Sequence, residues 1–178
     1  MTVRPLAIAS MCLLLLVSCG GRTASGPPTG HVPANNATEA RLLPTYADTL
    51  PAMDPSGFER LLGQLEGTPV VVNFWGEWCP PCRAEMPRLV AAHEEWGDRV
   101  QFVGVDILDS RDAARSFVDE FGMTFPSVFD PPDAIKSSLG LFGQPTTAFY
   151  RVDGSLEFAW SGPISEDTLE QHLQRIAG

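Results

Sequence analysis

Five apolar runs along the chain predict β-strands. The two at 70–75 and 100–105 are almost continuously apolar and rich in valine, which is typical of strands buried on both faces. An Asp-Gly pair at 153–154 predicts a hairpin turn between the last two runs. The full set of predicted strands is 70–75, 100–105, 125–129, 146–151 and 155–161.

Between these strands, apolar residues recur at helical spacing. Asp54-Pro55 is a typical helix start, and Gly67 ends the segment that follows it. Ser165 is the expected cap of the last helix, with acidic residues in its first turn. Helices are predicted from 55, 80 to about 96, 113 to 121, 133 to 139, and from 166. Alternating strands and helices predict an α/β domain with a mixed sheet between helices.

The junction between the first strand and the second helix holds the most informative residues. Trp78-Cys79-Pro80-Pro81-Cys82 follows the 70–75 run, and proline suits the first turn of a helix because its missing N–H leaves no bond unmade. Cysteines three apart lie on one helix face, close enough for a disulfide.

This placement predicts redox chemistry. Cys79 lies at the helix N-terminus, where free amide groups and the helix dipole stabilise an anion, so we expect the pKa of its thiol to fall below the ordinary value. Cys82, one turn deeper, is then the resolving thiol that opens a mixed disulfide. The alternatives are a static disulfide or half of a zinc site.

The motif resembles a known family. WCPPC after VVVNFW, with Pro87 five residues beyond Cys82, is similar to the membrane-anchored thiol:disulfide oxidoreductases of the TlpA/ResA type, over residues 55–178. The resemblance implies a thioredoxin fold: a central mixed β-sheet flanked by helices, with a TlpA-like helix–strand insertion near 125–139. Asn73 stands where cytoplasmic thioredoxins carry a buried aspartate, as is usual in this branch.

The resemblance also implies roles for residues around the cysteines. Glu85 occupies the position of an acidic residue thought to assist proton transfer, although a solvated helix carboxylate is an equal reading. Pro145 matches the cis proline of the fold, and the preceding Gln144 is expected to pair its backbone with an extended substrate peptide. Trp78 is expected to shield the disulfide and contact the substrate.

The N-terminus has a different character. Residues 1–18 combine a short basic start with an apolar run too short to span a bilayer, and Leu16-Val17-Ser18-Cys19 resembles a bacterial lipobox. We therefore expect a lipoprotein signal peptide at 1–18, a lipid on Cys19 and a flexible tether at 19–50, with the thioredoxin-like domain at 51–178. Ordinary signal-peptide cleavage is the alternative. Residues 41–51 are ambiguous between tether and an edge strand with Leu42, Leu43, Tyr46 and Leu50 facing inward.

Composition narrows the function. The formal charge of −10 at pH 7 argues against binding to nucleic acid. Of four cysteines, Cys12 and Cys19 lie in or next to the signal, which leaves the CPPC pair as the only thiols of the expected mature chain. The three histidines are scattered, and no nucleotide, flavin or metal motif occurs, so no metal and no cofactor are expected.

These features predict an extracytoplasmic enzyme, lipid-anchored to the bacterial membrane, that exchanges disulfides with protein thiols. The resemblance favours a reductant that receives electrons from a membrane partner and prepares apocytochrome c for haem attachment. A disulfide-forming oxidase of secreted proteins is the first alternative. A non-catalytic partner-binding lipoprotein with the same fold and a peroxidase are the others, and the CPPC pair argues against both.

Overall fold

A five-stranded mixed sheet with the strand order β3-β2-β1-β4-β5 forms the centre of the structure, a computed structural model that describes residues 40–178. β1 pairs with β2 in parallel and with β4 antiparallel, and β2 pairs with β3 in parallel. All five predicted strands are present: β1 (Val70–Trp75), β2 (Gln101–Ile107), β3 (Ser127–Asp130), β4 (Thr146–Tyr150) and β5 (Leu156–Ser161).

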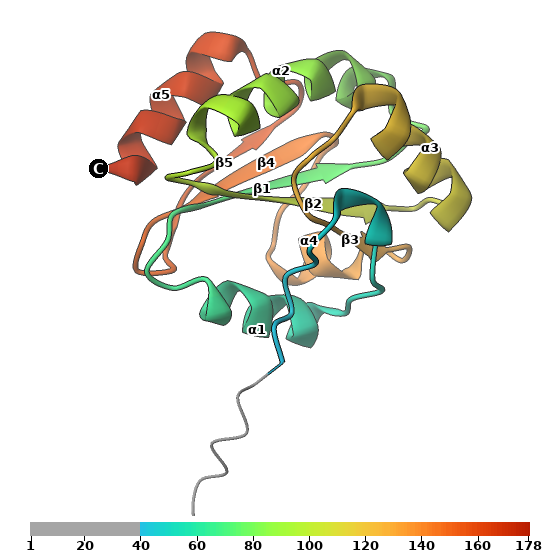
Figure 1. Ribbon diagram of the computed structural model, residues 1–178, viewed down its shortest axis with the longest axis horizontal. Coiled ribbons are helices and arrows are strands. Elements are labelled where there is room, and N and C mark those ends of the chain that lie inside the picture. The colour runs from blue at the N-terminus through green and yellow to red at the C-terminus, as the bar shows by residue number, and fades with distance from the viewer. Residues whose placement is uncertain (1–39) are drawn as a thin grey trace, which may run out of the picture. The chain divides into compact units, whose positions relative to one another are not determined.

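Helices cover both faces of the sheet (Figure 1). Three of them lie on one face: α2 (Pro80–Trp96), α3 (Arg111–Phe121) and α5 (Glu166–Ala177). The other face is covered by α1 (Pro55–Gln64) and the short α4 (Ala134–Ser138). The predicted caps are observed, since Asp54 and Ser165 each accept a backbone N–H in the first turn of their helix. This arrangement confirms the predicted thioredoxin fold.

Each face of the sheet has its own apolar core. On the α2 side, Trp75 stacks on Phe117 of α3 with ring centroids 4.6 Å apart, and both side chains are fully buried. On the α1 side, Phe58 packs with alternate residues of β1 and β2. All six residues of β1 are buried, because this strand has a neighbour on each side and helices on both faces. The strand that leads to the cysteines is therefore the most constrained element of the sheet.

The predicted insertion is present between β2 and β4. β3 adds to the sheet edge beside β2, and α4 follows it directly. The hairpin between β4 and β5 turns at Gly154, where φ is +78°.

The boundary of the domain differs from the prediction. The predicted tether extends to residue 50, but Leu43, Ala47 and Leu50 are buried in the two cores. The segment forms a short 3-10 helix, η1 (Ala47–Thr49), rather than an edge strand, and Tyr46 is 67% exposed rather than inward. A single parallel bridge joins Ala52 to Phe129. The leucines can be buried without a strand because the chain crosses the edge of the sheet near β3.

The predicted signal peptide, Cys19 and the tether up to residue 39 lie outside the described residues. Within residues 40–178, no helix combines the length and apolarity that a bilayer span requires.

Removing a buried leucine of the 41–50 segment tests whether this segment belongs to the domain. We expect Leu43→Ala and Leu50→Ala each to lower the free energy of unfolding by about 2–5 kcal/mol, because each leaves a cavity in a packed core. Urea unfolding of the oxidised protein measures this. The exposed Tyr46→Ala is the control and should change it by less than about 0.5 kcal/mol. If the leucine variants are as stable as the control, the 41–50 segment belongs to the tether and not to the domain.

Candidate active site

Cys79 and Cys82 lie where β1 ends and α2 begins, as predicted. The two are joined by a disulfide, with their Cα atoms 5.3 Å apart. Cys79 is the N-cap of α2, and its Sγ accepts a hydrogen bond from the backbone N–H of Cys82 at 3.2 Å. Cys79 is 2% exposed and Cys82 is fully buried, so the order of exposure is as predicted but the difference is small.

Pro80 and Pro81 limit the number of donors around this sulfur. The first turn of a helix normally offers several free N–H groups to an anion. Here the first two helical positions are prolines, which have none, so the N–H of Cys82 is the backbone donor that reaches Cys79. In the disulfide form, the end of the helix therefore gives the Cys79 sulfur one backbone hydrogen bond.

The turn before the cysteines is held by contacts with the end of β2 and the loop that follows it. The indole N–H of Trp78 donates to the carbonyl of Ile107 at 3.2 Å, and the backbone N–H of Glu77 donates to Asp109 Oδ2 at 2.7 Å. A Cβ on Gly76 would lie 2.5 Å from the Trp78 indole nitrogen, so a larger residue there would displace the indole from its contact with Ile107. Trp78 remains 46% exposed and directly precedes Cys79, where an approaching chain can touch it.

Glu85 is buried rather than solvated. One of its carboxylate oxygens accepts from the Asn73 amide at 3.0 Å, and the other accepts from the backbone N–H of Ile164 at 2.9 Å. Burial raises the pKa of Glu85 above its ordinary value, and these two hydrogen bonds and the charge of Arg88 oppose that rise. The Asn73 amide also donates to Thr147 of β4. Glu85 is therefore held on the same helix face as Cys82, one turn further along.

Gln144 and Pro145 lie in the loop before β4, and the bond between them is cis, as predicted. The side chain of Gln144 has contacts that the sequence does not indicate. Its Nε2 donates to the Phe74 carbonyl at 3.0 Å and to Cys82 Sγ at 3.2 Å, and its Oε1 accepts from Lys136 Nζ at 3.1 Å. This loop therefore reaches the second cysteine directly.

Asp106 is a buried acid. The sequence pattern predicts that a strand ends at this residue but does not indicate that its carboxyl group is buried. It lies opposite Trp75 in the register of β1 and β2, fully buried, and neither carboxyl oxygen has a hydrogen-bond partner among the described residues. Burial, followed by the nearby carboxylate of Asp109, raises the pKa of Asp106 to about 9. Asp106 is therefore a neutral acid at pH 7. It lies close to Asp109, which accepts the hydrogen bond from the Glu77 amide.

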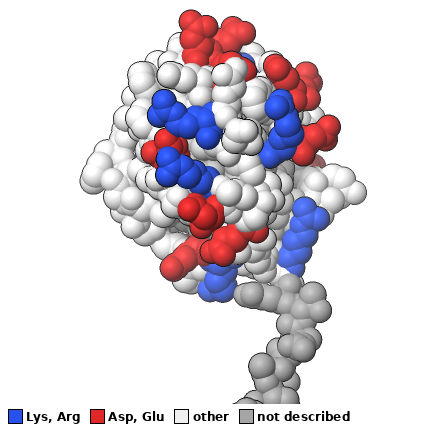
Figure 2. All heavy atoms as spheres, turned by 90° about the vertical axis from the view of Figure 1, so that its left-hand side faces the viewer, with Lys and Arg blue, Asp and Glu red and all other residues white. Residues whose placement is uncertain are grey.

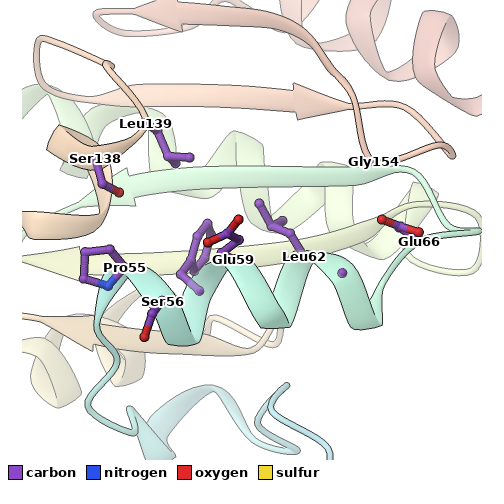
Figure 3. A pocket seen from close by; sticks show the side chains of 10 residues that line it. Pro55, Ser56, Glu59, Leu62, Glu66, Ser138, Leu139 and Gly154 are labelled. Atoms are coloured by element: carbon purple, nitrogen blue, oxygen red, sulfur yellow. The ribbon is translucent and has the colours of Figure 1, made fainter. Parts of the chain in front are cut away.

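Within residues 40–178, no group of three or more His, Cys, Asp or Glu side chains could hold a metal ion. A groove of about 760 Å³ lies between α1 and α4, on the face of the sheet opposite α2 (Figure 3). Glu59 and Glu66 lie along it, but none of the predicted site residues does.

The fold and this site define a thiol:disulfide oxidoreductase of the thioredoxin class: a buried strand, a CxxC disulfide at a helix N-terminus and a cis proline in the loop that reaches it. Comparison with known proteins agrees. The family model described as AhpC/TSA matches residues 48–159, and the chain belongs to this family.

Its relatives include proteins named thiol-disulfide oxidoreductase ResA, so the resemblance found in the sequence is confirmed. The protein from Geobacillus thermodenitrificans is 30% identical over 96% of this chain and 95% of its own. The one from Oceanobacillus iheyensis is 35% identical over 65% of this chain, a match that spans 61% of that relative's length. A secreted disulfide oxidoreductase of Mycobacterium tuberculosis, described as homologous to DsbE, superposes with a TM-score of 0.59 at 28% identity, over 77% of this chain and 98% of its own.

The raised pKa of Asp106 predicts how stability depends on pH. Because the folded-state pKa of about 9 exceeds the ordinary 3.8, Asp106 favours folding most below pH 4, and this contribution is lost as the pH rises toward 9. Between pH 5 and 8 the loss is up to about 4 kcal/mol, at about 1.4 kcal/mol for each pH unit. Asp106→Asn should remove this slope.

Urea unfolding of the oxidised protein at pH 5, 6.5 and 8 measures the effect. The exposed Asp98→Asn serves as the control and should keep the wild-type slope. Parallel pH profiles for wild type and Asp106→Asn would contradict this prediction, because they would show that Asp106 is ionised in the folded protein.

Proposed function

We propose that this protein is a reductant of protein disulfides. The observation that supports this direction is the Pro80-Pro81 pair, which leaves the single backbone N–H of Cys82 at the Cys79 sulfur. Strongly oxidising members of this class owe their potential to a highly stabilised thiolate, which favours their reduced form. A thiolate with fewer donors is stabilised less, so the oxidised form is easier to reach and the reduced protein gives up its electrons more readily.

The proposed reaction uses the two cysteines in sequence. The thiolate of Cys79 attacks one sulfur of the substrate disulfide, and the other substrate sulfur leaves as a thiolate and takes a proton. Cys82 then loses its proton to the carboxylate of Glu85 and attacks Cys79, which releases the second substrate thiol. Two electrons have passed to the substrate, and the Cys79–Cys82 pair has become the disulfide.

Exposed apolar side chains next to the site support a protein substrate. Trp78, directly before Cys79, is 46% exposed, and Phe142, three residues before Pro145, is 79% exposed. Pro145 has no N–H, so an extended substrate segment can lie close to Cys79 and pair with the backbone near Gln144. Figure 2 shows acidic and basic side chains interspersed on the face that it displays, with no continuous basic patch among the described residues there.

The proposed location is outside the cytoplasmic membrane, with a lipid on Cys19 as the anchor. The support is the short apolar run and lipobox-like residues before Cys19, which lie outside the described residues. The oxidised pair needs re-reduction, so the proposal includes a membrane protein that donates electrons. The proposed substrate is apocytochrome c, whose cysteines must be reduced before haem attachment, and it is suggested by the resemblance of the WCPPC region to the TlpA/ResA type.

A reduction potential tests the direction. Equilibration of the Cys79–Cys82 pair with glutathione or dithiothreitol buffers should give a value at or below about −200 mV, in the range of reducing members of the class. A value near about −120 mV, as in strong oxidants, would instead support the disulfide-forming oxidase.

Trapping with single-cysteine variants tests the roles of the cysteines. Cys82→Ser should accumulate a mixed disulfide with a disulfide-containing peptide, because nothing then resolves it, whereas Cys79→Ser should form little. Gel shift under non-reducing conditions reads the result. Equal trapping by both variants would contradict the assignment, and wild-type protein that exchanges with no peptide would support a non-catalytic binding protein.

Glu85→Gln tests proton transfer. Exchange should slow by on the order of 10²-fold, and the part of the wild-type rise in rate that follows the raised pKa of Glu85 should disappear, which leaves only the rise that follows ionisation of the cysteines. Stopped-flow tryptophan fluorescence between pH 4.5 and 8 measures both. Glu94→Gln, exposed on the same helix, should behave as wild type. A Glu85→Gln profile with the same shape as the wild-type profile would assign Glu85 a purely structural role.

A further inference from the structure

Lys136 is the only lysine in the chain, and it is almost completely buried. It lies on α4 with 6% of its surface exposed. All other members of the 12 lysines and arginines in the chain are arginines. Its ammonium group has three acceptors at 3.1 Å: Asp133 Oδ2, the Gly143 carbonyl and Gln144 Oε1. The three hydrogens of an ammonium group can each take one of these, so the buried charge is paired and fully hydrogen-bonded.

The contact with Lys136 decides which way the Gln144 amide points. The oxygen and nitrogen of an amide have nearly the same shape, so hydrogen-bond partners determine its orientation. Lys136 can only donate, and the Phe74 carbonyl can only accept. Together they place the oxygen toward Lys136 and the NH₂ group toward Phe74 and Cys82 Sγ, 3.2 Å from the sulfur.

The loop that carries Gln144 is itself tightly placed. Gly143 has φ of +88°, a conformation that favours glycine, and a Cβ there would also collide with the Ser161 hydroxyl of β5. The Gly143 carbonyl accepts from both Lys136 and Thr146. Gln144 is therefore fixed at both its backbone and its side-chain end.

We propose that Lys136 is a positioning residue of the redox site, which acts through Gln144 to keep an N–H donor on the sulfur of Cys82. When a substrate is bound to Cys79 as a mixed disulfide, Cys82 must become a thiolate before it can attack Cys79 and release the substrate thiol. A donor aimed at Cys82 stabilises that thiolate, while its proton passes to Glu85. The inference rests on the resolving role proposed for Cys82, but not on whether the protein reduces or oxidises its substrates.

Ionisation of Cys82 in a Cys79→Ser background tests this directly. Thiolate absorbance at 240 nm, followed against pH, should show that Lys136→Met lowers the acid ionisation constant of the Cys82 thiol about threefold to tenfold, the effect of one weakened hydrogen bond. Gln144→Leu should lower it at least as much. Ser137→Ala, exposed on the same helix, is the matched control and should leave it unchanged.

The double variant separates positioning from a direct effect of charge. If Lys136 acts through Gln144, adding Lys136→Met to Gln144→Leu should produce no further change. A further change of the same size would show that the ammonium acts on Cys82 through space and would overturn the proposal, as would an unchanged ionisation constant in Lys136→Met alone.

A conservative variant guards against loss of folding. Lys136→Gln keeps a donor for Gln144 Oε1 and should restore most of the wild-type ionisation, with circular dichroism confirming that both variants are folded. If Lys136→Gln behaves like Lys136→Met while both are folded, hydrogen bonding to Gln144 is not the cause and the proposal is wrong. Ionisation is measured without any substrate, so this outcome is independent of whether the wild-type protein reduces disulfides.

Discussion

The hydrogen bond from the Cys82 N–H to the sulfur of Cys79 is the interaction on which the site depends. It forms because Cys79 is the N-cap of α2, whose third residue is Cys82. The two prolines start the helix and at the same time remove two other donors. The Cys79 sulfur is therefore left with one backbone donor at the end of the helix, and the proposed direction of electron transfer rests on this limit.

The environment of the Cys82 sulfur is built largely by residues that are far from Cys82 in the sequence. Glu85 lies on the same helix, but its carboxylate is held by Asn73 in β1 and by the backbone of Ile164 near the C-terminus. Gln144 reaches Cys82 from the loop before β4, and Lys136 holds it from α4. A buried carboxylate and a hydrogen-bond donor are thus supplied by separate elements, each fixed by further contacts.

Local patterns are enough to predict the strands, the helix caps and the CPPC site, because each depends on residues a few positions apart. The cis proline is expected from the resemblance to a known family. Contacts across the fold cannot be read in this way. The residues around Leu43 and Leu50 resemble a tether. Nothing in the neighbouring sequence indicates that distant parts of the chain bury these two leucines. One lysine among many arginines is a visible signal, but only the fold brings Lys136 to Gln144. The pattern around Asp106 likewise indicates only a strand end, since its burial depends on elements far from it in the chain.

The ionisation of Cys79 in the reduced, folded protein tests the central claim most directly. The rate of alkylation by iodoacetamide, measured against pH, reports the thiolate at this position. With one amide donor and the helix end behind it, Cys79 should be half ionised below about pH 8.5, the value for a free cysteine, but well above the value of about 3.5 found in the strongest oxidants. Half ionisation at about pH 8.5 would show that the helix end does not stabilise the thiolate. Half ionisation near pH 3.5 would show that the loss of two amide donors to proline does not limit this stabilisation.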